Sequence, residues 1–216
     1  MKLRSIQRGI LARLILAAAF VSVITGCAVG NTYSYRQADL AIPVSGDEAI
    51  GLTVVDRRPY VLSGDKPAAF IGLQRGGFGN PFDVTTASGQ PLADEVQTAL
   101  ANAMRQRGYK VAELFPSSSK ESDILQAIQS GKMAKNIVLV FREWKTDAMM
   151  SLGLSHDLVL QVIGPDGAML GTASSQSHKE SLGPGGFEDQ NALLAQRALA
   201  SKIEALFRDT SIQDAL

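Results

Sequence analysis

Few residues of this sequence have the types and the spacing that catalysis needs. Ser155, His156 and Asp157 follow one another directly, and they are the residue types of a nucleophile, a general base and a group that orients the base. Because the three residues are predicted to enter a strand, successive side chains point to opposite faces, and His156 faces away from both neighbours. The triplet therefore predicts a polar strand entry with a partly exposed His156, and it does not predict a catalytic triad.

The other titratable residues give no stronger sign of a site. His178 stands beside Lys179 and Glu180, which indicates a solvated strand end. Two histidines on either side of a hairpin, without a free cysteine, fall short of a structural zinc pattern. No spacing requires the carboxylates to converge in space; the candidates are Asp56, Asp83, Glu143 and Asp157. We therefore expect no enzymatic activity, no cofactor and no metal.

A glycine-rich segment, residues 59–90, contains the run FIGLQRGGFGNPFDV. It raises the question of phosphate binding, but no lysine followed by serine or threonine comes after the glycines, and no G-x-G-x-x-G closes a strand and opens a helix. We expect the glycines to supply turns, while the aromatic residues pack the segment down or form a short edge strand. Because so long a loop is uncommon unless it is functional, we predict a partner-binding surface at Arg75, Phe78, Asn80 and Phe82.

The remaining reactive residue is Cys27, the only cysteine of the chain. Residues 1–13 carry four basic side chains and no acid, and residues 14–24 form an apolar run of 11 residues. This is the layout of a secretory signal. As a helix the run would be about 16 Å long at 1.5 Å per residue, against the roughly 30 Å of hydrocarbon that a spanning segment crosses. We therefore expect residues 1–26 to be a cleaved signal peptide.

The residues at the expected cleavage point, Ile24-Thr25-Gly26-Cys27, resemble the bacterial lipobox. The resemblance implies diacylglycerol on the Cys27 sulfur and an acyl chain on the new amino terminus, and more than one chain gives stable anchoring. Lipoproteins held in the inner membrane tend to have aspartate after the cysteine. Here Ala28 follows it, so we expect an outer-membrane protein that faces the periplasm. The alternative is ordinary cleavage near Gly26 that leaves Cys27 as a free thiol.

Composition agrees with an exported globular domain. The signal holds four of the 21 basic residues and none of the 21 acids, so the mature chain has 17 bases, 21 acids and a formal charge of −4. Mild acidity argues against nucleic acid as a partner, since nucleic-acid binding requires a basic patch. The expected partners are the membrane, through the N-terminal lipid, and an envelope protein or peptidoglycan.

Patterns of apolar residues predict the elements of the domain. Strands are expected at 49–56, 109–114 and 136–145, the last of them buried on both faces at its start and emerging at Trp144. Helix signals, with a proline in the first turn and a glycine after the last, bound residues 91–107. Further expected elements are a short helix ending at Gly131, a loop around 149–153, a hairpin of 155–163 and 168–177 around the turn 164–167, and a helix over about 189–208.

This order of elements predicts a single α/β domain, residues 39–216, in which two long helices and one short helix pack on a mixed β-sheet. The polar residues 27–38 are expected to be a lipidated tether between the membrane and the domain. The alternative is that part of this segment, Tyr33 and Tyr35, pairs with the sheet. Residues 59–90 are expected to be a glycine-rich loop of the domain.

Three stretches of the mature chain carry a resemblance to a known family: GLTVVDRRP, LADEVQTALANAMRQRGYKV and the C-terminal RDTSIQDAL. They resemble the YajG-type family of uncharacterised bacterial outer-membrane lipoproteins. The most specific pieces are Arg107-Gly108-Tyr109 and residues 209–214, and the glycine-rich segment is longer here. The resemblance implies a compact envelope domain on a lipid tether, and it lends no catalytic residues.

These expectations favour a non-catalytic outer-membrane lipoprotein that binds another component of the cell envelope. An alternative is an auxiliary subunit of lipid or solute transport, which needs an apolar groove between the last helix and the sheet. A third hypothesis is an envelope hydrolase, which needs a cleft where several acids converge. An exposed apolar patch would favour partner contact, and an apolar cavity would favour ligand carriage.

Overall fold

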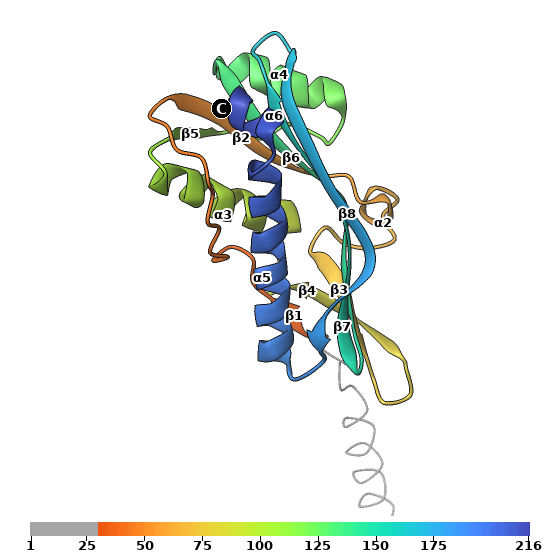
Figure 1. Ribbon diagram of the computed structural model, residues 1–216. Helices are drawn as coiled ribbons and strands as arrows, with labels where there is room; N and C mark the ends of the chain where they lie inside the picture. Colours follow the sequence, from red (N-terminus) through yellow and green to blue (C-terminus); the bar gives the residue numbers. More distant parts are fainter. Residues whose placement is uncertain (1–29) are drawn as a thin grey trace, which may run out of the picture.

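The computed structural model describes residues 30–216, so the expected signal peptide and Cys27 lie outside the described residues. Three strands are much longer than the others: β6 (Lys135–Ala148), β7 (Ser151–Ile163) and β8 (Met169–Pro184), with β8 at an edge of the sheet. They follow one another as antiparallel neighbours, and Figure 1 shows them running along most of the domain. The predicted α/β fold with a mixed sheet is confirmed.

The free edge of β6 pairs with two strands in succession. Up to Phe141 it pairs in parallel with β2 (Ala49–Asp56), and from Thr146 to Ala148 it pairs in parallel with β3 (Phe70–Arg75). β5 (Lys110–Glu113) extends the sheet beyond β2, whereas β4 (Pro81–Thr86) and β1 (Thr32–Tyr33) extend it beyond β3. The sheet of the described residues thus divides into two arms at residues 142–145 of β6, and we call this position the fork.

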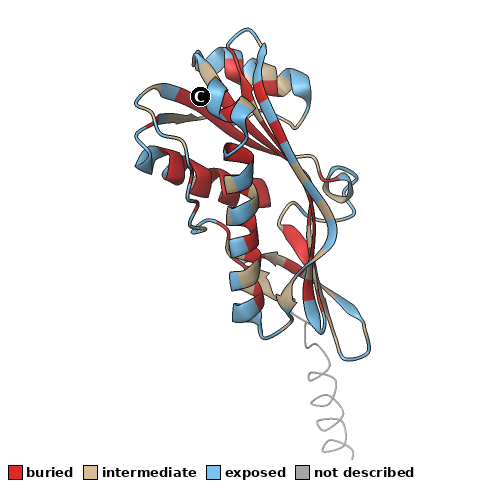
Figure 2. Cartoon of the chain, viewed as in Figure 1, coloured by how far each residue is buried: buried red, intermediate tan, exposed pale blue. Residues whose placement is uncertain are grey.

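Two long helices cover one face of the sheet. α3 (Leu92–Gln106) packs on β2 and β5, and α5 (Glu188–Phe207) packs on β7, β8 and β1. Figure 2 shows buried residues along the sides of both helices that turn toward the strands. The short helix α6 (Thr210–Ala215) packs on β8 at the C-terminal end of α5 and adds the buried Ile212 to the same core.

The helix α4 (Glu121–Gly131) packs on the other side of β6 and β7. Its Ile124 and Ile128 join Val138 and Val140 of β6 in a second apolar cluster, whereas the residues between them on β6 point into the larger core under α3 and α5. Because side chains of a strand alternate between faces, a strand covered on both sides reads as a continuous apolar run. The predicted burial of the start of this strand on both faces is confirmed.

The end of β6 differs from the prediction. Trp144 does not emerge into solvent; it is fully buried, and its indole Nε1 donates a hydrogen bond to the Tyr35 hydroxyl at 3.0 Å. The charged residues around it, Glu143 and Lys145, alternate with it and point to the opposite face of the strand. The prediction that the strand emerges at Trp144 was wrong. The charged residues were taken to end the burial of both faces of the strand, whereas one face stays buried at Trp144.

Two segments predicted as loops contain regular structure. Residues 59–90 hold one helical turn, α2 (Pro59–Leu62), and the antiparallel hairpin of β3 and β4. Glycines hid the strand pattern: at Gly72 a Cβ would lie 2.0 Å from Thr146 Oγ1, so only glycine lets β3 approach β6 this closely. The expected loop at 149–153 is a turn at Met149 and Met150, because β6 and β7 extend to meet it.

The folded domain begins before residue 39, where the sequence analysis placed its start. β1 pairs with β4, and Tyr33 and Tyr35 are 1% and 0% exposed, so residues 32–38 of the expected tether belong to the folded domain. The alternative in which these tyrosines associate with the sheet describes the structure. The two buried rings hold the segment against the domain.

The helix face predicted for α3 can be tested by truncation of Leu100, which is fully buried in the core. Leu100→Ala should lower the free energy of unfolding by about 2–5 kcal/mol, because it removes apolar contacts and leaves a cavity. The matched control is Asn102→Ala on the exposed side of the same helix, which should change it little. Equal losses for the two variants, measured by urea denaturation, would show that the helix face is assigned incorrectly.

Candidate functional site

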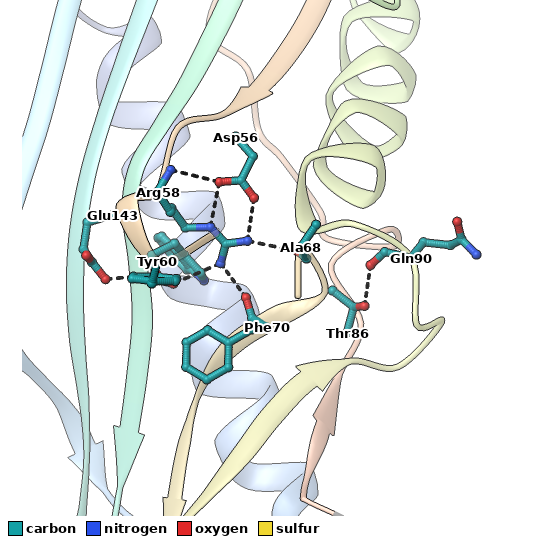
Figure 3. A network of polar contacts seen from close by, with 9 residues as sticks. Asp56, Arg58, Tyr60, Ala68, Phe70, Thr86, Gln90 and Glu143 are labelled. Atoms are coloured by element: carbon teal, nitrogen blue, oxygen red, sulfur yellow. Dashed lines mark hydrogen bonds and ion pairs between the residues drawn. The ribbon is translucent and has the colours of Figure 1, made fainter. Parts of the chain in front are cut away.

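Arg58 fills the fork of the sheet, and its side chain is fully buried. Its guanidinium forms a bidentate ion pair with Asp56 at the end of β2, with Nε 2.9 Å from Oδ1 and Nη2 2.6 Å from Oδ2. The same group donates to the backbone carbonyl oxygens of Ala68, Phe70 and Trp144 (Figure 3). These contacts give an acceptor to each of the five N–H donors that a guanidinium carries, so Arg58 has none left for a ligand.

Tyr60 and Glu143 lie beside Arg58 in the same network (Figure 3). The Tyr60 hydroxyl lies 3.1 Å from Glu143 Oε1 and 3.0 Å from the carbonyl oxygen of Trp144. The guanidinium carbon of Arg58 lies 5.5 Å from the centre of the Tyr60 ring, within the range of a cation–π contact. Burial raises the pKa of both Glu143 and Tyr60. The network joins β2, α2, β3 and β6, and its chemistry is that of a structural site.

Removal of Arg58 should therefore cost much of the stability of the domain. Arg58→Ala leaves the Asp56 carboxylate and three carbonyl oxygens without their donor, and we expect the free energy of unfolding to fall by about 3–5 kcal/mol. The control is Arg208→Ala, because this side chain is 67% exposed and its ion pair with Glu204, four residues earlier, is long at 3.8 Å. If thermal or urea unfolding shows no larger loss for the first variant than for the second, the fork does not depend on Arg58.

A polar pocket of about 450 Å³ lies over β6, β7 and β8. Its lining combines hydroxyl, carboxylate, amide, ammonium and imidazole groups: Glu143, Lys145, Ser155, His156, Asp157, Gln176, Ser177 and His178. Ser155 Oγ lies 3.5 Å from His178 Nδ1 and accepts a hydrogen bond from the backbone N–H of Lys179 at 3.2 Å. Activation of a hydroxyl by a base needs a separation of about 2.6–3.2 Å, so this pair is too far apart for that role as it stands.

The pairing of Ser155 with His178 could not be read from the sequence. Both residues lie on neighbouring strands, but the register of β7 and β8 shifts beside the turn, between Val162 and Ile163. From the pair Val162–Gly171 to the pair His156–Ser177 the register is regular, and continued by one residue it sets His178 opposite Ser155. A hairpin counted outward from the turn at 164–167 without the shift at Val162 would place a different residue opposite Ser155. The pocket can hold a small polar group through hydrogen bonds.

His156 points away from Ser155 and Asp157, as predicted, but it is not partly exposed. Its ring is 2% exposed, packs against Trp144 and lies 3.0 Å from Ser175 Oγ through Nε2. The other nitrogen, Nδ1, lies 3.8 Å from Glu180 Oε2. Burial, aided by the charge of Lys202, lowers the pKa of His156. The histidine is a core residue, and the expectation of exposure failed because α5 covers this face of β7.

The lowered pKa predicts a loss of stability in mild acid. The unfolded chain takes up a proton on His156 near pH 6.5, whereas the folded chain resists protonation until a lower pH. The stabilisation is therefore fully present above about pH 6.5 and is lost as the pH falls toward the folded-state pKa. His156→Gln should have a shallower decrease in free energy of unfolding between about pH 6.5 and 5 than the control His178→Gln. Equal slopes in urea titrations would contradict this prediction.

The four residues predicted to bind a partner lie on the β3–β4 hairpin. Arg75 forms a bidentate ion pair with Asp147 of β6, at 2.7 and 2.6 Å, and so fastens the hairpin to the sheet. Phe78 stands at the tip of the turn with its side chain 99% exposed, Asn80 is exposed beside it, and Phe82 is half-buried below. The hairpin thus brings the four residues to one end of the domain, with Phe78 as the outermost apolar group.

Residues 30–216 contain no group of three or more histidine, cysteine, aspartate or glutamate side chains arranged to hold a metal ion. Among the helices of the same residues, none is long and apolar enough to cross a bilayer.

Comparison with known proteins assigns no family: no family model and no curated protein matches the chain. A Xanthomonas campestris protein of family DUF330 is similar in structure, with 12% identity, a TM-score of 0.49 and coverage of 86% of this chain and 95% of that one. The PelC dodecamer of Paraburkholderia phytofirmans has 12% identity, a TM-score of 0.37 and coverage of 84% and 96%. Lipoprotein GNA1162 of Neisseria meningitidis has 11% identity, a TM-score of 0.30 and coverage of 74% and 99%. No residue role is carried over at these values, and the YajG-type resemblance stays a prediction.

Proposed function

We propose that this chain is a non-catalytic lipoprotein of the cell envelope, attached through lipid on Cys27 to the periplasmic face of the outer membrane. Its β3–β4 hairpin contacts another component of the envelope. The lipobox-like sequence at residues 24–27 supports the attachment, and Ala28 in place of aspartate supports the outer membrane. Neither a metal nor a cofactor is part of the proposal.

The observation that carries the contact surface is the exposed ring of Phe78 on an ordered hairpin. Its side chain is 99% exposed, although the hairpin is fastened by the ion pairs of Arg75 with Asp147 and of Lys66 with Asp83. A large aromatic ring held in water loses the free energy that burial would provide, so a fixed exposed ring indicates a surface that is covered in use.

The transport alternative needs an apolar groove between the last helix and the sheet, and side chains fill that space. Leu154 and Leu158 of β7 and Leu199 and Ile203 of α5 are each fully buried in one core. An apolar surface rather than an apolar cavity therefore favours partner contact over ligand carriage.

The hydrolase alternative needs a cleft where several acids converge, and the lining of the polar pocket brings together two, Glu143 and Asp157. The Ser155 hydroxyl in the same pocket lies 3.5 Å from the imidazole of His178, outside the hydrogen-bonding range of an activated nucleophile.

The attachment is tested by the variants Cys27→Ser and Ala28→Asp in the full chain. Mass spectrometry of the wild-type N-terminal peptide should show a chain that begins at an acylated Cys27. Cys27→Ser removes the acylated sulfur, so the protein should leave the outer-membrane fraction and appear in soluble form or uncleaved. Ala28→Asp keeps the acylation site and should move the protein to the inner membrane. Full recovery of Cys27→Ser with the outer membrane would overturn the proposal.

A further inference from the structure

Three uncharged loops at one end of the domain expose large apolar side chains. The β3–β4 turn presents Phe78, which is 99% exposed, and the β6–β7 turn presents Met150, which is 86% exposed, and Met149, which is 51% exposed. The segment between β8 and α5 presents Phe187, which is 90% exposed. Figure 1 shows the three loops at the same end of the molecule, and we call these four side chains the apolar tips.

Hydrogen bonds hold the three loops in a fixed arrangement. Gln74 of β3 accepts through Oε1 from the side-chain amides of Asn31, at 3.3 Å, and of the buried Asn191 on α5, at 3.5 Å. The backbone N–H of Gly185 donates to the carbonyl oxygen of Met150 at 3.0 Å. A Cβ on Gly185 would lie 2.9 Å from a backbone oxygen of the β6–β7 turn, so the two loops touch. The apolar tips are therefore presented by one ordered platform.

The first described residues enter the domain within this platform. The backbone N–H of Thr32 donates to Glu188 Oε1 at 2.7 Å, and Glu188 directly follows Phe187. Only three peptide units separate Cys27 from Gly30, and they span at most about 10 Å when extended. A lipid on Cys27 therefore keeps this end of the domain within about that distance of the bilayer surface.

We propose that the apolar tips dock the domain on the bilayer that holds its own N-terminal lipid. The inference rests on the proposed function, because it requires an acylated Cys27, and it names the envelope component that the hairpin contacts. Apolar groups of proteins on a membrane surface enter the boundary between headgroups and acyl chains to a depth of about 5–10 Å. Phenylalanine and methionine on uncharged loops can enter this layer without carrying a charge into it.

The short connection also favours lipid over a protein as the occupant. Gly30 lies at most about 10 Å from Cys27, whereas an α-helix with its side chains is about 10–12 Å thick, so little room is left for a protein layer between the bilayer and the part of the platform that the chain enters. A second copy of the chain could cover the tips only from the side. Two of the charged groups next to the tips are engaged, Arg75 with Asp147 and Glu188 with the backbone of Thr32, whereas Asp189 on α5 is exposed.

The test uses two methionines at opposite ends of β7. Met150 is 86% exposed among the tips, and Met169 of β8 is 50% exposed opposite Ile163, at the other end of this 13-residue strand and roughly 40 Å away at about 3.3 Å per residue. In the full acylated lipoprotein Cys27 is blocked, so Met150→Cys and Met169→Cys each introduce one free thiol for an environment-sensitive dye. The labelled proteins are reconstituted in vesicles made mostly of phosphatidylethanolamine, with some phosphatidylglycerol.

Docking predicts that dye at position 150 emits at shorter wavelength in vesicles and is quenched several-fold by lipids that carry a nitroxide near the headgroup. Dye at position 169 should show neither effect and should be quenched by iodide in solution. Equal iodide quenching at both positions would overturn the inference. A second copy of the chain covering the tips would also overturn the inference. In that case the wavelength shift at position 150 would disappear when the protein is diluted among vesicles, and the lipid nitroxide would not quench the fluorescence of the dye.

Failure of the proposed function itself gives a different result in the same experiment. The wild-type protein has Cys27 as its only cysteine, so it should take up no dye if that sulfur is acylated. Dye on Cys27 of the wild-type protein would disprove the lipid anchor and with it both proposals. An unlabelled wild type together with a solvent-exposed dye at position 150 would leave the anchor intact and disprove docking alone.

Discussion

The ion pair of Arg58 with Asp56 at the fork is the interaction on which the rest of the fold depends. β6 serves two parallel partners in succession, and the strands must separate where one partner ends and the next begins. Backbone carbonyl groups at such a position are buried without a strand to bond, and each buried group without a partner costs about 1–3 kcal/mol. Arg58 offers its donors in one plane to Ala68, Phe70 and Trp144, while Asp56 balances its charge. An apolar side chain of the same size would fill the space and leave the carbonyl groups unsatisfied.

The fork also places the beginning of the folded chain. At the fork, β6 turns Trp144 into the core, where the indole donates to the Tyr35 hydroxyl, and the backbone N–H of Tyr35 donates to the buried Glu95 on α3 at 2.6 Å. The same arm of the sheet contains the β3–β4 hairpin and β1. The chain therefore enters at the far end of the long strands, beside the turns that carry Met150 and Phe78, and a short lipid connection brings that end to a membrane.

The two faces of the β6–β7–β8 sheet differ in chemistry. The face under α5 buries His156 among Trp144 and aliphatic side chains, whereas the opposite face holds a polar pocket lined by the buried Ser155, by the exposed His178 and by carboxylates. Because burial lowers the pKa of His156, we expect it to make the stability of the domain sensitive to mild acid. The apolar tips stand apart from both, since they belong to the loops at the end of the sheet and make no part of its core.

The sequence by itself determined the fold class, most element positions and the expected export signal, because these depend on local patterns. The continuous apolar run of β6, the helix face around Leu100 and the turn at 164–167 each act over a few residues, and the structure agrees with them. Only the tertiary structure decided the role of Arg58, the register that sets Ser155 beside His178, and the gathering of Phe78, Met150 and Phe187 at one end. These features join residues that are distant in the chain, and they depend on strand order, on a shift of register and on close approaches at glycines. One sequence does not reveal such relations, since each depends on how separate elements pack and not on the pattern within any of them.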